Sequence, residues 1–133
     1  VDMLVKRSSS IGRAIFHLSF IVKYRHGIFR NGIVRERCEQ LLVEVAIAND
    51  MQIIEVGFAA NHIHLIADIG LKSIPEAVKL LKGYSAKVLL QEFPELKQQF
   101  FYGSGLWSPA YFFDSIGSDY LDVCNYVKNQ EYS

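Results

Sequence analysis

Two histidines separated by a single residue, His62 and His64, are the first side chains whose spacing suggests chemistry. They lie in a stretch of alternating residues that predicts a β-strand, and side chains two apart in a strand leave the same face of the sheet. Neutral imidazole nitrogens bind ions such as Mn, Fe, Co, Ni and Zn, so the pair could hold one divalent ion. An isolated pair more often occupies a half-exposed sheet face without metal, so a second feature is needed.

A tyrosine and a glutamine near the end of the chain, Tyr126 and Gln130, form that second feature. Their segment has the apolar spacing of a helix, on which residues four apart project together. With a pKa of about 10, a phenol is a poor nucleophile at neutral pH and needs an electrophile that is already polarised and aligned. A divalent ion on a phosphate oxygen would supply both effects, and the amide oxygen of Gln130 could complete its coordination.

The elements that must position these residues follow a regular order. We expect a strand over 15–24, a helix over 33–48, strands over 52–59 and 62–69, a helix from Ser73 to about 92, a strand within 110–116 and a last helix to about 130. This is the α+β, ferredoxin-like (RRM-like) β-α-β-β-α-β arrangement, with two helices on one face of the sheet, plus a C-terminal helix that carries the tyrosine.

In that arrangement the first and third strands are neighbours. The polar side of the first strand carries His17, Ser19 and Lys23, and it could share the helix-free face with His62 and His64. Phe20 and Tyr24 belong to the opposite, apolar side and are expected to face the helices. DNA could then reach a metal on the helix-free face.

The composition predicts one domain, 1–133, in which residues 1–13 form a polar, basic lead-in that need not be ordered. The formal net charge is zero, so nucleic-acid binding would depend on basic residues gathered on one face. The candidates for phosphate contacts are Lys23, Arg25, Arg30 and Lys82.

Two further features of the composition concern the cysteines and the cellular compartment. Cys38 and Cys124 lie far apart in segments that look helical, and we expect buried, reduced thiols. No apolar stretch approaches about 18 residues, and the N-terminus lacks the order of a signal peptide. These features predict a soluble cytoplasmic protein that does not bind a membrane.

Several blocks of the sequence together resemble the single-tyrosine HUH transposases of bacterial and archaeal insertion sequences, in which U is a hydrophobic residue. The two principal blocks are 62–64 and 123–130, which contain the histidine pair and the tyrosine with its glutamine. The other blocks are 23–25 with 28–29, 81–85, 93–96, and 106–108 with 111–112. They occur in the family's order and span residues 14 to 130, which makes them far more specific than one histidine pair.

The resemblance implies that His62, His64 and Gln130 bind Mg or Mn and that Tyr126 attacks the scissile phosphate of single-stranded DNA. The product would be a covalent 5′-phosphotyrosine link, which a 3′-hydroxyl could later attack to rejoin strands. It also implies a nucleoid-associated homodimer that recognises hairpins near the ends of the element and has no small-molecule substrate. Because Gly117 and Ser118 offer a joint before the last helix, we expect the histidines of one subunit to meet the tyrosine of the other.

Two other interpretations of His62 and His64 and of the fold stay open. A zinc hydrolase could use His62, His64 and a third histidine, His17 or His26, to activate water, although it would leave Tyr126 unexplained. A non-catalytic RRM-like module could instead stack bases on sheet aromatics. Trp107 could also stack on a base, but a place in the core fits it better.

Overall fold

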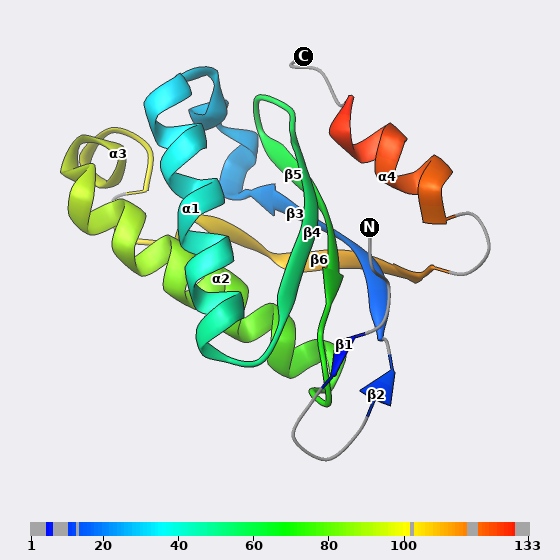
Figure 1. Cartoon of the computed structure of the whole chain (residues 1–133). Helices are drawn as coiled ribbons and strands as arrows, with labels where there is room; N and C mark the ends of the chain where they lie inside the picture. Colours follow the sequence, from blue (N-terminus) through cyan, green and yellow to red (C-terminus); the bar gives the residue numbers. More distant parts are fainter. Residues whose placement is uncertain (1–4, 7–10, 13, 102, 117–119, 130–133) are drawn as a thin grey trace.

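The computed structural model describes residues 5–6, 11–12, 14–101, 103–116 and 120–129 (Figure 1). The strands are β1 (Val5–Lys6), β2 (Ile11–Gly12), β3 (Ile15–Val22), β4 (Gln52–Phe58), β5 (His62–Asp68) and β6 (Trp107–Ser115). The helices are α1 (Gly32–Ala48), α2 (Ile74–Glu92), α3 (Pro94–Gln99) and α4 (Tyr120–Lys128), with short 3-10 turns at Lys23–Arg25 and Ile28–Arg30.

The main sheet has four antiparallel strands in the order β4-β5-β3-β6. The central pair is β3 with β5, so the first and third expected strands are neighbours, and the ferredoxin-like arrangement is confirmed. In the register of this pair, Ser19 lies opposite His64 and Ile21 lies opposite His62. The polar side of β3 and the histidine side of β5 therefore belong to one face.

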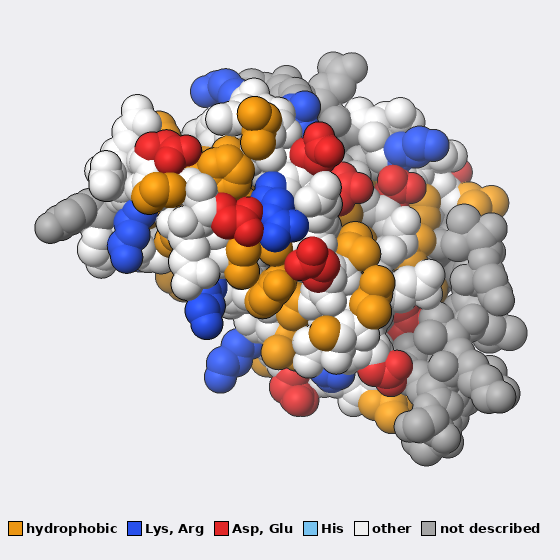
Figure 2. Space-filling model, turned by 60° about the vertical axis from the view of Figure 1, so that its left-hand side comes forward, with side chains coloured by type: hydrophobic (Ala, Val, Ile, Leu, Met, Phe, Trp, Pro, Cys, Tyr) orange, Lys and Arg blue, Asp and Glu red, His pale blue; other side chains and the backbone are white. Residues whose placement is uncertain are grey.

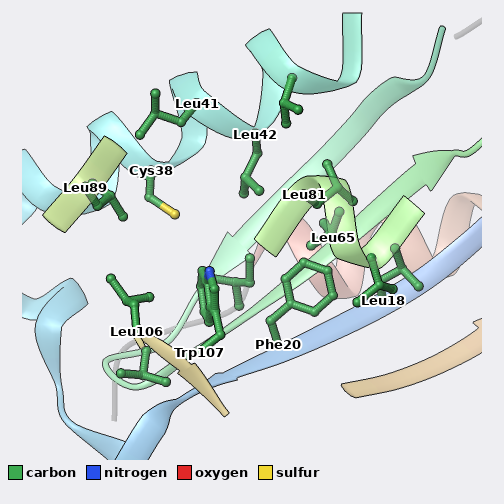
Figure 3. Packing of buried hydrophobic residues seen from close by; sticks show 14 of the residues in the cluster. Leu18, Phe20, Cys38, Leu41, Leu42, Leu65, Leu81, Leu89, Leu106 and Trp107 are labelled. Carbon is green, nitrogen blue, oxygen red and sulfur yellow. The ribbon is translucent and has the colours of Figure 1, made fainter. Parts of the chain in front are cut away.

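The opposite face of the sheet carries the core. Figure 1 shows α1 and α2 side by side over this face, and Figure 3 shows Leu42 of α1 directed toward Phe20 and Trp107 of the sheet. Trp107 is buried and donates its Nε1–H to Oγ of Ser85 over 3.0 Å, which satisfies the one polar atom of its ring. The expectation that this tryptophan belongs to the core is confirmed.

Both long helices begin at residues that cap them. Asn31 accepts the backbone N–H groups of Ile33 and Val34, and Ser73 forms a reciprocal capping box with Glu76. Among the described residues neither cysteine forms a disulfide, and Cys38 is buried in the core whereas Cys124 is half-buried. Burial raises the pKa of the Cys38 thiol, so this side chain is inert and the sequence prediction for it is confirmed.

Strand β3 ends earlier than expected, at Val22, and the prediction that Tyr24 faces the helices is wrong. Tyr24 and Arg25 both have left-handed backbone conformations, with φ of 61° and 57°, and Tyr24 is 65% exposed. Strand alternation cannot continue through two such residues because they turn the chain away from the sheet.

Three further differences concern strand and helix boundaries. Strand β6 begins at Trp107, three residues before the expected range, and the short helix α3 was not expected. The small β1–β2 pair lies within 1–13, the segment predicted as a lead-in. A helix of six residues and a strand pair of two residues each are too short to give a periodic sequence signal.

Helix α4 lies on the other side of the sheet from α1 and α2, against β4 and β5 (Figure 1). Its anchor is Val127, which is fully buried against Ile15 and Ile66 in a small cluster separate from the main core. Ile15 and Ile66 have the same strand parity as His17 and His64, so α4 packs on the histidine face.

The outer surface of the helix layer has mixed charge. In the view of Figure 2, acidic and basic side chains are interspersed over this side, with hydrophobic side chains between them. Part of this pattern is the bidentate pair that Arg37 of α1 forms with Glu92 of α2. None of the helices that the structure describes has the length and apolar character that a membrane span needs.

Candidate active site

His62 and His64 project from β5 onto the face that α4 partly covers. Their ring centroids are 5.0 Å apart, and both side chains are half-buried, whereas Ile63 between them is fully buried under the helices. The expected placement of the pair on one sheet face is confirmed.

Each histidine has a partner for its Nδ1 atom. The Nδ1–H of His62 donates to Oδ1 of Asn61, in the turn before the strand, over 2.9 Å. Nδ1 of His64 lies 3.0 Å from Nε2 of His17 and 3.0 Å from Oγ of Ser19, both on β3. These contacts leave Nε2 as the nitrogen with which each ring could bind an ion.

The surroundings of His62, His64 and His17 keep their imidazoles neutral. Burial, together with the nearby His62 and His17, lowers the pKa of His64 to about 4. Burial and the positive charge of Arg25 lower the pKa of His62, and burial lowers the pKa of His17 against the opposing effect of Asp114. At neutral pH the pair is therefore in the unprotonated form that binds a metal.

Tyr126 of α4 lies beside this pair. Its ring centroid is 5.8 Å from that of His64 and 6.5 Å from that of His17, and its side chain is 59% exposed. The buried neighbour Val127 explains this placement. Val127 anchors the helix on the sheet, and Tyr126, which points in a different direction around the helix, remains accessible at the edge of this contact.

The tyrosine and the histidines that meet here belong to the same chain. In this single chain α4 docks on its own sheet, and the exchange of α4 between two subunits stays a prediction. Gly117 and Ser118, the proposed joint, lie outside the described residues, and so does Gln130, the expected third ligand.

The two imidazoles have the chemistry that binds a divalent ion. The alternative, a zinc site of three histidines, does not agree with the structure. Nε2 of His17 is directed at Nδ1 of His64 rather than toward a shared ion. His26 packs on Phe100 and Phe101, with ring centroids at 4.6 and 5.5 Å. Across the part of the chain that the structure describes, no three His, Cys, Asp or Glu side chains converge as ligands.

The four predicted phosphate contacts separate into two groups. Lys23, Arg25 and Arg30 lie in the segment that follows β3, close to the turn that leads into β5. The charge of Arg25 acts directly on His62. Lys82 lies on the helix side, where its ammonium donates to the backbone oxygen of Ser108 over 2.6 Å, so the structure does not bring it to the site.

Comparisons with known proteins agree with this fold. The family model described as "Transposase IS200 like" matches residues 10–130. A curated relative, the ISDra2 transposase TnpA of Deinococcus radiodurans, is 30% identical over 117 residues, which cover 86% of this chain and 82% of that protein.

Two solved structures share the fold. A Deinococcus radiodurans protein described as a transposase aligns with a TM-score of 0.74 and 26% identity, over 97% of this chain and 99% of that one. A REP-associated tyrosine transposase bound to a REP hairpin aligns with a TM-score of 0.61 and 14% identity, over 92% of this chain and 69% of that one. Because the family model matches nearly the whole chain, this protein belongs to the IS200-like family of single-tyrosine transposases.

Proposed function

We propose that this transposase is a metal-dependent endonuclease and strand-transferase for single-stranded DNA, with Tyr126 as its nucleophile. The observation that carries the proposal is the exposed phenol of Tyr126 beside the neutral pair His62 and His64. A weak oxygen nucleophile next to side chains able to hold a divalent ion is the combination that phosphoryl transfer requires.

The proposed reaction exchanges one phosphoester for another. The Tyr126 hydroxyl oxygen attacks the scissile phosphorus and loses its proton, while the bond from phosphorus to the 3′-oxygen breaks and that oxygen leaves as a 3′-hydroxyl. The DNA 5′-phosphate then remains on the tyrosine. Attack by another 3′-hydroxyl reverses these steps and joins strands, with no nucleotide cofactor, because the phosphotyrosine link retains the energy of the original bond.

His62, His64 and Gln130 would hold the ion, through imidazole nitrogens and an amide oxygen. When bound, the ion would polarise a phosphate oxygen and so make the phosphorus a better electrophile. A site of two imidazoles and one amide carries no charge, so we expect hard Mg to bind weakly without DNA phosphate and Mn to bind more tightly.

The proposed DNA partner is a single strand, with hairpins near the ends of an insertion sequence as its recognition elements. A structural neighbour was solved with a REP hairpin, which supports this choice. Arg25, exposed and close enough for its charge to act on His62, is a suitable phosphate contact next to the reacting group, and Lys23 and Arg30 could extend this contact. Such contacts would also explain association with the nucleoid.

A direct test is incubation of the protein with labelled single-stranded element ends and Mn, followed by denaturing electrophoresis. The proposal predicts labelled DNA that migrates with the protein, together with a free fragment that ends in a 3′-hydroxyl. A zinc hydrolase would give only free fragments, and an RRM-like module would bind without cleavage. Either of these two results would contradict the proposal.

The working unit that we propose is a homodimer. Within the described sheet β6 is an edge strand, and its two adjacent phenylalanines, Phe112 and Phe113, are 60% and 51% exposed on opposite faces. A long apolar edge strand is a template for pairing with another strand, and in a symmetric dimer the two β6 strands could pair with each other.

Mixing two inactive variants tests whether α4 is exchanged within this dimer. The contact of α4 with its own sheet centres on one fully buried side chain, Val127, so undocking of the helix has a low cost. We therefore expect that heterodimers of His64→Ala and Tyr126→Phe regain a fraction of wild-type cleavage, because one site of an exchanged dimer is intact. If heterodimers are shown by mass spectrometry and no cleavage returns, the exchange is contradicted and the cis arrangement stands.

A further inference from the structure

We infer that His17 and Ser19 are positioning residues that hold His64 as the tautomer with a proton on Nδ1, so that its Nε2 is available to a divalent ion. This inference rests on the proposed metal site and deepens it. It assigns a role to two residues of β3 that the reaction itself does not use.

The geometry around His64 is specific. Its Nδ1 has two partners at the same distance of 3.0 Å, Nε2 of His17 and Oγ of Ser19. Both partners come from the strand that pairs with β5, and Ser19 lies directly opposite His64 in the register. The ring of His17 also lies near His64, with centroids 5.1 Å apart. The orientation of His64 is thus set by a rigid neighbouring strand and not by a loop.

The hydrogen bond at Nδ1 of His64 is linked to the state of its Nε2. A neutral imidazole has one N–H donor and one acceptor nitrogen, and the hydrogen bond at one nitrogen determines which role the other takes. When Nδ1 of His64 donates to the hydroxyl of Ser19 or to Nε2 of His17, the lone pair of Nε2 is left for the ion. Metal-bound histidines generally have such a hydrogen-bond acceptor behind them.

The adjacent histidine has the same arrangement with a different partner. Nδ1–H of His62 donates to Oδ1 of Asn61, an oxygen that can only accept, so Nε2 of His62 is the unprotonated nitrogen. The inferred tautomer of His64 makes the two rings equivalent, with Nε2 as the ligand atom of each. One ion would then meet two matching donors.

The first test is a measurement on the metal-free protein. Imidazole ¹⁵N chemical shifts at neutral pH are expected to show Nδ1–H for His64 in the wild type, and a shift toward Nε2–H in a His17→Leu/Ser19→Ala double variant. A wild-type His64 with its proton on Nε2, or the same tautomer in both proteins, would overturn the inference. Because no metal is present, this result does not depend on the proposed function.

The second test is calorimetric titration of Mn into folded variants, with circular dichroism as the check on folding. His17→Leu is expected to weaken binding about 10-fold or more, as is usual when the partner of a ligand histidine is lost. His17→Gln, whose amide oxygen can accept the same proton, should restore most of the affinity, and Ser19→Ala should cause a smaller loss.

The matched control for the Mn titration is His26→Leu. His26→Leu removes a histidine that packs on Phe100 and Phe101, and it should leave Mn affinity unchanged. Equal affinities in wild type and His17→Leu would overturn the inference, and so would equal losses in His17→Leu and His17→Gln, which would indicate a merely structural role. Absence of Mn binding in the wild type would contradict the metal site instead, and the tautomer measurement would still decide the inference.

Discussion

Replacement of Tyr126 by phenylalanine is expected to abolish strand cleavage and the covalent protein–DNA adduct, a loss of at least about a thousandfold. The variant lacks one oxygen, the atom that attacks phosphorus in the proposed reaction. Its ring can still lie beside His64, and the side chain is 59% exposed, so stability and DNA binding should change little. Gel-shift binding and cleavage assays on the same labelled strand measure both properties.

The matched controls are two other tyrosines of the described chain. Tyr84 lies on the helix side, where its hydroxyl donates to Glu44, and Tyr24 is exposed after β3. Tyr84→Phe and Tyr24→Phe should both form the adduct. An adduct that forms at the wild-type rate in Tyr126→Phe would show that another residue is the nucleophile.

The second large effect is expected for His64→Ala, which should lose cleavage and most of its Mn affinity. Of the two imidazoles proposed as ligands, His64 has its Nδ1 within 3.0 Å of two protein partners, so it is the better oriented. Its removal leaves His62 and an amide oxygen, too few donors to hold the ion in place.

Calorimetry with Mn compares wild type, His64→Ala and the control His26→Ala. The control removes an imidazole of equal size whose ring packs on Phe100, Phe101 and Tyr24. We expect wild-type affinity in the control and a loss of about 100-fold in His64→Ala. Equal Mn affinity in all three proteins would exclude His64 as a ligand.

The sequence was sufficient to predict the sheet and the histidine pair because both depend on local periodicity. Alternation places His62 and His64 on one face whatever the rest of the fold is, and helical spacing places Tyr126 on the margin of an apolar arc. The capping residue Ser73 was an equally local signal for the start of α2.

Features set by long-range contacts could not be predicted in the same way. The contact of His17 with His64 joins residues 47 apart and depends on the register of β3 with β5. The polar parity of β3 did indicate that His17 could share the face, but not that it would contact His64. Asn61 was not among the predicted site residues, although its position next to His62 was a usable signal.

The early end of β3 illustrates a different limit. Tyr24 continues the apolar alternation, yet it and Arg25 adopt left-handed conformations that bulky residues rarely take. Such conformations cost about 1 to 3 kcal/mol each and persist only where the surrounding structure enforces them, commonly at functional sites. Local sequence preference therefore predicted a continued strand at Tyr24, whereas the fold turns the chain away from the sheet there.

Identification of the residue that carries DNA is the decisive measurement for Tyr126 as the nucleophile. The wild-type protein is allowed to react with a short single strand in the presence of Mn, denatured and digested, and the DNA-linked peptide is sequenced by mass spectrometry. We expect one modified peptide, with a nucleotide 5′-phosphate on the hydroxyl oxygen of Tyr126. A nucleotide on any other residue, or cleaved DNA with no modified peptide, would contradict it.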